Sequence, residues 1–159
     1  MKSFEQLDVW NNDCQYDGDL EVIFKETLSH SEAEQVINLQ VQAKRQIQEE
    51  VNELSETGLQ EKSPLRQRHL YVGMIMRDGC IRGYGYGYLE SKGIYYFDTI
   101  YISEQLRNSG AGKYFLCCFL NYVKENVPNI ILFKAITQVE NTIAIRLLES
   151  LNFSPVSTQ

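Results

Sequence analysis

The chain has 159 residues, 43% of them hydrophobic and 23% charged, and a net charge of −6, which are values typical of one globular domain. No apolar run reaches the roughly 18 residues that a membrane span needs, and an acidic chain without a basic stripe argues against a nucleic-acid surface. The charge is uneven, because the first 62 residues hold 14 acidic and 5 basic residues (−9) and the rest hold 7 and 10 (+3). The first part therefore suits a cationic partner and the second a phosphate-bearing one, although a solvated acidic helix also explains the first part.

Four cysteines, Cys14, Cys80, Cys117 and Cys118, lie outside any CxxC or Cys/His ligand spacing. We therefore expect no metal site, and we expect reduced thiols in a cytoplasmic protein. The opening residues MKSFEQLDVWNND contain no apolar core of a secretory signal, which agrees with that compartment.

The first half of the chain predicts one strand followed by helix. Residues 1–19 form an N-terminal arm or an added strand in this interpretation, and residues 20–159 form a single domain that begins with a strand over residues 20–26. Ser31 and Glu34 have the spacing of a capping box that starts a helix. The helical pattern continues to residue 54 with a break near residues 41–44, and a linker follows.

The second half predicts three antiparallel strands and then helix, strand and helix. Asp78-Gly79 is a strong hairpin signal between the first two strands. The strands and helices are expected over residues 69–76, 80–90, 93–102, 112–126, 129–137 and 141–153. This order is that of a mixed α/β domain.

The stretch QLRNSGAGKYFL places two glycines in a turn between a strand and a helix. Such a turn binds phosphate, because glycine lets the unpaired N–H groups of the helix approach the oxygens. A Walker A loop is excluded, since Arg107 stands at its first glycine and Tyr114 at its Ser/Thr position. A dinucleotide loop is excluded because Phe115 replaces its third glycine.

The remaining pattern, Arg107-x-x-Gly110-x-Gly112, resembles the acyl-CoA loop of the GCN5-related N-acetyltransferase (GNAT) superfamily. A second stretch, NTIAIRLLESLNF, is similar to the family motif N-x-x-A-x-x-L-Y-E-x-x-G-F. The resemblance covers about Leu20 to Phe153. It implies an α/β (α+β) GNAT fold, with a central mixed, mostly antiparallel sheet that is splayed between its fourth and fifth strands and flanked by helices.

The resemblance also implies a site for acetyl-CoA or another acyl-CoA. The loop would hold the pyrophosphate, the strand before it would pair with the pantetheine, and Asn141 would steady the pantetheine arm. The cofactor-binding residues implied are Ile100, Ile102, Arg107, Asn108, Ser109, Gly110, Ala111, Gly112, Lys113 and Asn141.

This sequence departs from the family pattern in three places. Leu148 replaces the tyrosine that often protonates the departing thiolate, so solvent, Tyr101 or a tyrosine of the GYGYGY stretch would supply that proton. Asn152 replaces a glycine but can still cap a helix. The chain also ends before the family's seventh strand, and we expect residues 1–19 or a partner subunit to cover the open edge.

Asp98 interrupts the apolar strand YYFDTIYI. We expect it to be buried, where a carboxylate can act as a base toward an ammonium group, as the family resemblance also implies. The alternative is that Asp98 caps a β-bulge or pairs with an arginine. Glu90 is a second candidate base. Tyr84, Tyr86 and Tyr88 share one face, either packed on a helix or forming a wall beside the acceptor.

The predicted function is N-acyl transfer, most simply of acetyl, from acyl-CoA to a primary amine by direct attack. The acceptor would be a small-molecule amine or a peptide or protein amine, with no nucleic acid or membrane involved, and a homodimer is one arrangement. The alternative is a catalytically silent CoA-binding regulator of the same fold.

Overall fold

The computed structural model describes residues 1–7, 14–16, 18–39 and 69–156. The helical pattern expected beyond residue 39 and the linker after it lie outside the described residues. The strands are β1 (Lys2–Leu7), β2 (Glu21–Lys25), β3 (His69–Arg77), β4 (Cys80–Ser91), β5 (Ile94–Ile102), β6 (Leu132–Thr137) and β7 (Ser154–Pro155). The helices are α1 (His30–Leu39), α4 (Ala111–Asn126) and α5 (Thr142–Ser150), with a 3-10 turn, η3 (Glu104–Leu106), before α4.

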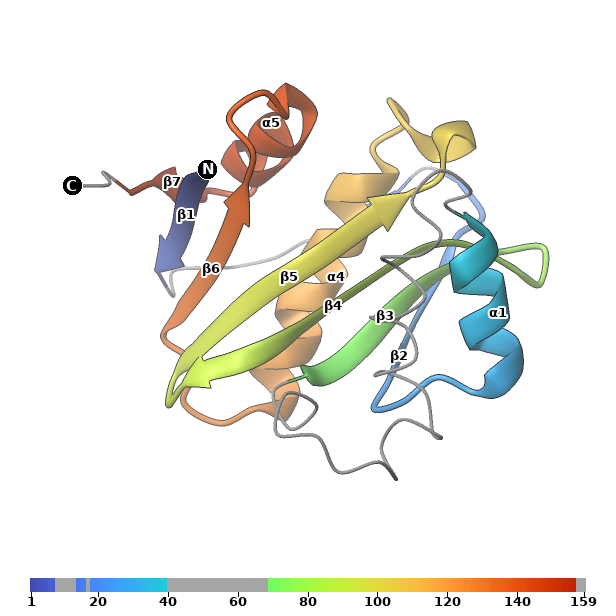
Figure 1. Ribbon diagram of the computed structural model, residues 1–159, viewed down its shortest axis with the longest axis horizontal. Coiled ribbons are helices and arrows are strands. Elements are labelled where there is room, and N and C mark those ends of the chain that lie inside the picture. The colour runs from blue at the N-terminus through green and yellow to red at the C-terminus, as the bar shows by residue number, and fades with distance from the viewer. Residues whose placement is uncertain (8–13, 17, 40–68, 157–159) are drawn as a thin grey trace.

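The seven strands form one sheet in the order β2-β3-β4-β5-β6-β1-β7. Every neighbouring pair is antiparallel except β5 and β6, which are parallel and connected through α4. The expected mixed, mostly antiparallel sheet flanked by helices is therefore confirmed (Figure 1). None of the described helices is both long enough and apolar enough to cross a membrane.

The two faces of the sheet carry separate apolar clusters. On one face, α4 and the end of α5 pack on β5 and β6, with Phe115, Phe119 and Phe133 fully buried. On the other face, α1 covers β3 and β4, where Tyr84 and Tyr86 are buried with Val36 (Figure 1). Tyr84 and Tyr86 of the GYGYGY stretch therefore pack on a helix, which was one of the two alternatives, whereas Tyr88 is half-buried beside the ring of Tyr96.

The glycines between these tyrosines serve packing on the opposite face. A Cβ on Gly85 would lie 3.2 Å from the ring of Phe115, and a Cβ on Gly87 would lie 2.6 Å from the ring of Tyr95. Side chains at these positions would push α4 and the Tyr95 ring away from β4. The bare side of this strand is thus filled by aromatic rings of the core.

The capping box of α1 lies two residues earlier than the sequence pattern predicted. The Ser29 hydroxyl accepts from the Glu32 N–H at 3.2 Å, and the Glu32 carboxylate accepts from the Ser29 N–H at 2.9 Å. The prediction of Ser31 and Glu34 was wrong because the sequence holds two overlapping S-x-x-E patterns. Leu28, which is fully buried before the cap, selects the first of them.

The N-terminal residues supply an inner strand of the sheet. β1 lies between β6 and β7, with Phe4 opposite both Ala135 and Pro155. Phe4 has no exposed surface and belongs to the cluster under α4 and α5. Figure 1 shows this blue strand beside the red C-terminal strand, far from the blue β2 that follows it in sequence.

Two cysteines form a disulfide, so the expectation of four reduced thiols was wrong. Cys14 is bonded to Cys117 in the middle of α4, with the two Cα atoms 5.7 Å apart and a sequence separation of 103. Spacing rules detect cysteines that lie close together in sequence. Cys14, which follows β1, and Cys117, in α4, come together only in the folded chain. Cys80 and Cys118 are free thiols.

Candidate functional site

A β-bulge at Asp98 marks the point where β5 and β6 separate. Tyr86 lies opposite Thr99 and Gly87 lies opposite Phe97, so Asp98 is the extra residue of β5. The parallel pairing with β6 ends at Phe97, opposite Ala135. Beyond this point the edge of β5 that faces β6 is open, which is the splay that the sequence predicted between these strands.

The loop after β5 ends at the N-terminus of α4 in a left-handed conformation. Asn108 has φ 61° and Gly110, the N-cap of α4, has φ 84°. The first hydrogen bond of the helix runs from the Tyr114 N–H to the Gly110 carbonyl at 3.0 Å. The N–H groups of Ala111 and the next two residues therefore have no acceptor within the helix and carry the positive end of its dipole.

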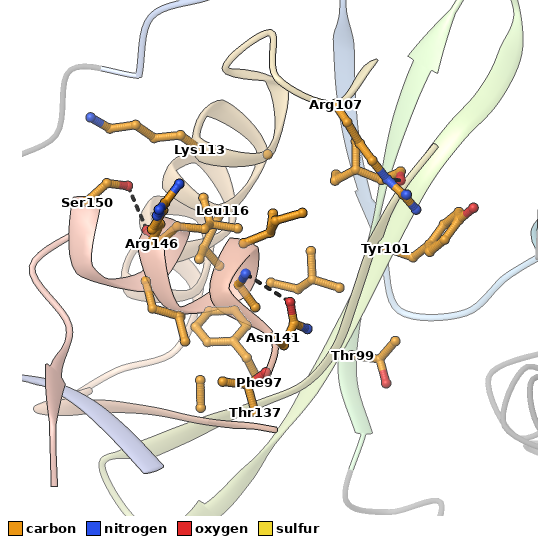
Figure 2. A pocket seen from close by; sticks show the side chains of 18 of the residues that line it. Phe97, Thr99, Tyr101, Arg107, Lys113, Leu116, Thr137, Asn141, Arg146 and Ser150 are labelled. Atoms are coloured by element: carbon orange, nitrogen blue, oxygen red, sulfur yellow. Dashed lines mark hydrogen bonds between the residues drawn. The ribbon is translucent and has the colours of Figure 1, made fainter. Parts of the chain in front are cut away.

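One cavity of ≈ 800 Å³ joins the loop to the splay. Its described lining carries the cations Arg107, Lys113 and Arg146 and a single carboxylate, Asp98. Figure 2 shows Arg107 on the side of β5 and Lys113 and Arg146 on the side of α4 and α5, with Asn141 between them. A predominantly cationic wall beside a helix N-terminus suits a phosphate-bearing ligand.

Arg107 is fixed against β5. Its Nε donates to the Ile102 carbonyl at 3.0 Å, its guanidinium lies 5.5 Å from the ring centre of Tyr101, and an Nη lies 3.9 Å from the Glu104 carboxylate. These contacts hold the start of the loop against the end of β5.

The predicted cofactor residues fall into two groups. The cavity is lined by Ile100, Ile102, Arg107, Asn108, Gly110, Gly112, Lys113 and Asn141. Ser109 and Ala111 are not among the lining residues. The Ser109 hydroxyl donates to the Leu106 carbonyl, and the Ala111 side chain is fully buried, so only their backbone could reach a ligand.

Asn141 is the N-cap of α5, since its Oδ1 accepts from the Ala144 N–H at 3.1 Å. This bond fixes the side-chain amide at the mouth of the cavity (Figure 2). Its Nδ2 group is the part that remains for a ligand.

Arg146 was not singled out from the sequence. Ile143, Arg146, Leu147 and Ser150 all line the cavity, and their spacing of three, four and seven residues places them on one face of α5. The helical spacing of the second motif, NTIAIRLLESLNF, would have placed Arg146 on the same face as Ile143 and so identified it from the sequence.

The structure brings Asp98 and Tyr101 to the cavity but not in the expected environments. Asp98 is exposed, and the prediction of a buried carboxylate was wrong because Asp98 alternates with the buried side chains of Tyr95 and Phe97 and so lies on the other face of β5. The Tyr101 hydroxyl donates to the Leu39 carbonyl at the end of α1, at 3.2 Å. Leu148, at the family's tyrosine position, is 6% exposed and forms part of the apolar floor.

The carboxylates of Asp98 and Glu90 interact with neighbouring side chains of the sheet. Burial raises the pKa of Tyr96, and the negative charges of Asp98 and Glu90 raise it further. Glu90, the second candidate base, forms an ion pair with Lys134 at 2.9 Å. Within the part of the chain that the structure describes, no cluster of three or more His, Cys, Asp or Glu side chains could hold a metal ion.

Comparison with known proteins points to one family. The model of the acetyltransferase (GNAT) family matches residues 33–153. No curated protein matches at a significant level.

Solved structures of low identity share the fold. A tandem GNAT protein from the clavulanic acid biosynthesis pathway has a TM-score of 0.73 at 17% identity; the match covers 97% of this chain and 50% of that one, so this chain spans half its length. The aminoglycoside N-acetyltransferase AAC(6′)-Iy, in complex with a CoA bisubstrate analogue, has a TM-score of 0.61 at 12% identity, with 89% and 95% of the two chains covered. The ribosomal-protein-S18-alanine N-acetyltransferase from Escherichia coli has a TM-score of 0.63 at 12% identity, with 86% and 80% covered.

The family match spans both motifs and the strand between them, and the sheet with its splay at Asp98 is the fold of these neighbours. The chain therefore belongs to the acetyltransferase (GNAT) family.

Proposed function

We propose that the chain is an N-acyltransferase that moves an acyl group, acetyl in the simplest case, from acyl-CoA to a primary amine. The observation that carries this proposal is a continuous cavity of ≈ 800 Å³ that runs from the cationic N-terminus of α4 into the gap between β5 and β6. The end at the α4 N-terminus suits a pyrophosphate, and the end between β5 and β6 suits an extended pantetheine arm. Family membership and neighbours solved with CoA or its analogues support acyl-CoA as the co-substrate.

The donor would lie along the open edge of β5. The free N–H groups at the start of α4 would bind the pyrophosphate, with Lys113 and Arg146 adding charge. Successive residues of a strand direct their backbone N–H and C=O groups to opposite sides. The hydrogen bond from the Ser103 N–H to the Arg82 carbonyl of β4 shows that, in the same register, Thr99 and Tyr101 also direct their backbone groups toward β4. The backbone groups of Ile100 and Ile102 therefore point toward β6, where an extended pantetheine would pair like an added strand.

The reaction would be a direct attack of the neutral amine on the thioester carbonyl. The new C–N bond forms as the C–S bond breaks, the amine proton passes to Asp98 directly or through water, and the thiolate leaves to be protonated by solvent. A backbone N–H at the bulge would polarise the carbonyl, since the bulge frees strand groups from the ladder. Asp98 suits the proton transfer because it is accessible and lies at the mouth of the splay.

A second candidate function is CoA binding without transfer. Leu148 cannot protonate a thiolate, and the Tyr101 hydroxyl is directed to the Leu39 carbonyl rather than held free for that task. This alternative predicts a complete donor site beside an inactive acceptor site.

We propose the cytoplasm as the compartment, because acyl-CoA is the co-substrate, and an acceptor that is a small-molecule, peptide or protein amine. The acidic balance of the first 62 residues favours a cationic acceptor and disfavours nucleic acid. The sheet ends in the two-residue β7, in which Pro155 blunts the edge, so a homodimer would need another surface.

The test is release of free thiol from acetyl-, propionyl- and butyryl-CoA in the presence of a panel of polyamines, aminoglycosides, amino acids and peptides. Transfer of isotope from labelled acetyl-CoA to one amine, identified by mass spectrometry, supports the enzyme. CoA binding in titration calorimetry with no thiol release for any amine, including those of a cell extract, supports the silent binder. Absence of CoA binding overturns both.

A further inference from the structure

Residues 14–16 are attached to α4 at two points. Cys14 forms the disulfide with Cys117, and its sulfur also accepts from the Asn121 amide at 3.1 Å. One turn nearer the helix start, the ring of Tyr16 stacks on Tyr114 with 5.5 Å between ring centres and an interplanar angle of 27°. We call residues 14–16 the strap.

The strap reaches the loop at the start of α4. The Tyr16 hydroxyl donates to the Ser109 hydroxyl at 3.3 Å, and the Ser109 hydroxyl in turn donates to the Leu106 carbonyl. Ser109 lies between the two left-handed residues of the loop, Asn108 and Gly110. This chain of contacts explains why Ser109 is directed away from the cavity while both of its neighbours line it.

We propose that Tyr16 is a positioning residue for the acyl-CoA loop, and that the thiol–disulfide state of Cys14 and Cys117 controls how firmly it holds that loop. The inference rests on the proposed function, because it concerns the same donor site. With the disulfide intact, Tyr16 is held two residues from a covalent anchor on the helix that it contacts. After reduction, the strap is held by the stacked Tyr16 ring, the exposed hydrogen bond of Tyr16 and the contact of the Cys14 sulfur with Asn121, without a covalent bond.

The chemistry is thiol–disulfide exchange with a dithiol reductant. A reductant thiolate attacks the sulfur of half-buried Cys14, because Cys117 is only 5% exposed, and Cys117 leaves as a thiolate that takes up a proton. The second reductant thiol then resolves the mixed disulfide, so two electrons and two protons pass to the protein and the reductant becomes a disulfide. Burial raises the pKa of the neighbouring Cys118, opposed by a hydrogen bond from Tyr114, so it competes poorly as a thiolate.

The proposed cytoplasmic location makes this thiol–disulfide exchange relevant, because reductants are present there. Where acyl-CoA is made and used in the cytoplasm, disulfides are usually transient and redox-sensing. A bond between the strap and α4, two residues from the Tyr16 side chain that contacts the donor loop, would therefore report the redox state of the surroundings as a change in donor affinity.

The experiment measures CoA affinity by titration calorimetry in a Cys80→Ser, Cys118→Ser background, oxidised or treated with dithiothreitol, with the thiol count checked by alkylation and mass spectrometry. We expect reduction to weaken CoA binding about three- to tenfold, the usual effect of one or two modest contacts. Cys14→Ser should bind with the weaker affinity in both conditions. Tyr16→Phe should bind like the reduced protein while still oxidised, whereas Tyr122→Phe, which alters a ring on the same helix stacked on Phe24, should bind like the parent.

A disulfide that serves stability alone would lower the melting temperature and leave CoA affinity unchanged. Equal affinities of the oxidised and reduced forms, measured well below the melting temperature of both, would overturn the inference and leave the proposed function intact. A Tyr16→Phe variant that binds CoA like the oxidised parent would show that the Tyr16 hydroxyl does not position the loop. Failure of both forms to bind CoA would instead overturn the proposed function, and this inference with it.

Discussion

Gly110 has a left-handed backbone conformation that only glycine adopts readily, and the space where its side chain would lie is open. Its φ is 84°, and a Cβ placed on it would meet no atom within 4 Å. Replacing it with valine should therefore distort the loop without any clash in the protein. We predict that Gly110→Val weakens CoA binding at least tenfold, about 1.4 kcal/mol, in titration calorimetry.

Gly79 provides the matched control. It has φ 76° in the β3–β4 hairpin, equally open surroundings, and no place in the lining of the cavity. Gly79→Val should lower the melting temperature by a similar amount and leave CoA affinity unchanged. If both variants lose affinity equally, the loss at Gly110 reflects general destabilisation.

Asp98 on β5 and Glu90 on β4 both raise the pKa of Tyr96, but of these two described carboxylates only Asp98 lines the cavity. We predict that Asp98→Asn lowers the transfer rate on the order of 10²–10⁴-fold, the usual worth of a positioned base, with CoA affinity retained. Glu90→Gln removes a carboxylate that is paired with Lys134 and should keep the parent rate to within a few-fold. An Asp98→Asn enzyme that works at the parent rate would show that another group accepts the proton.

At the scale of an element, α1 depends on its capping box. Ser29→Ala should cost about 1 kcal/mol of unfolding free energy, measured by urea denaturation, because the Glu32 N–H loses its acceptor. Ser31→Ala, inside the first turn, should cost much less. A larger loss at Ser31 would mean that the helix starts where the sequence pattern alone placed it.

The same box makes α1 sensitive to acid. Burial would raise the pKa of Glu32, but hydrogen bonds from Lys25 and Ser29 outweigh it and lower the pKa below the ordinary value of 4.5. A lowered folded-state pKa contributes stability that is present above the unfolded value and is lost as the pH falls through the folded one. We predict that the stability difference between the parent and Glu32→Gln is largest above pH 4.5 and shrinks below it, as urea titrations across that range would show.

At the scale of the molecule, β1 joins the sheet to the cluster under α4. Phe4 is fully buried there, whereas Ser3 points to the opposite face of the sheet. We predict that Phe4→Ala lowers the unfolding free energy by about 3–5 kcal/mol and that Ser3→Ala changes it little. A small effect of Phe4→Ala on the urea midpoint would indicate that β1 is a loosely held arm.

The sequence predicts this fold well where the signal is local. Strand alternation, the Asp78-Gly79 turn and the helical spacing of α4 and α5 all indicate structure within a few residues, and the predicted strands and helices within the described residues are present with shifted ends. The two motifs located the donor loop and its helix for the same reason. Overlapping local signals fail, as at Ser29 and Ser31, because burial of Leu28 decides between them.

Features that depend on contacts far apart in sequence could not be predicted. The Cys14–Cys117 bond joins segments that no pattern links. The family resemblance led us to expect that residues 1–19 or a partner subunit would cover an open sheet edge, but it did not show that β1 would lie between β6 and β7. In the apolar strand YYFDTIYI the sequence does not show which side chains face the core, so Asp98 was expected to be buried. In the structure Tyr95 and Phe97 face the core, and the bulge at Asp98 then brings Ile100 to that same face. The donor site was thus predictable from motifs, whereas the environment of the proposed base was not.

The position of β1 in the sheet also determines when this part of the chain can fold during synthesis. β1 is made before every other described strand, whereas its partners β6 and β7 are made after the other described strands of the sheet. At about 5–20 residues per second, the strand waits several seconds or more with both edges unpaired. The α4 side of the core therefore closes only after residue 155 has emerged, and a chaperone that binds short apolar segments would find the chain's first strand available throughout that interval.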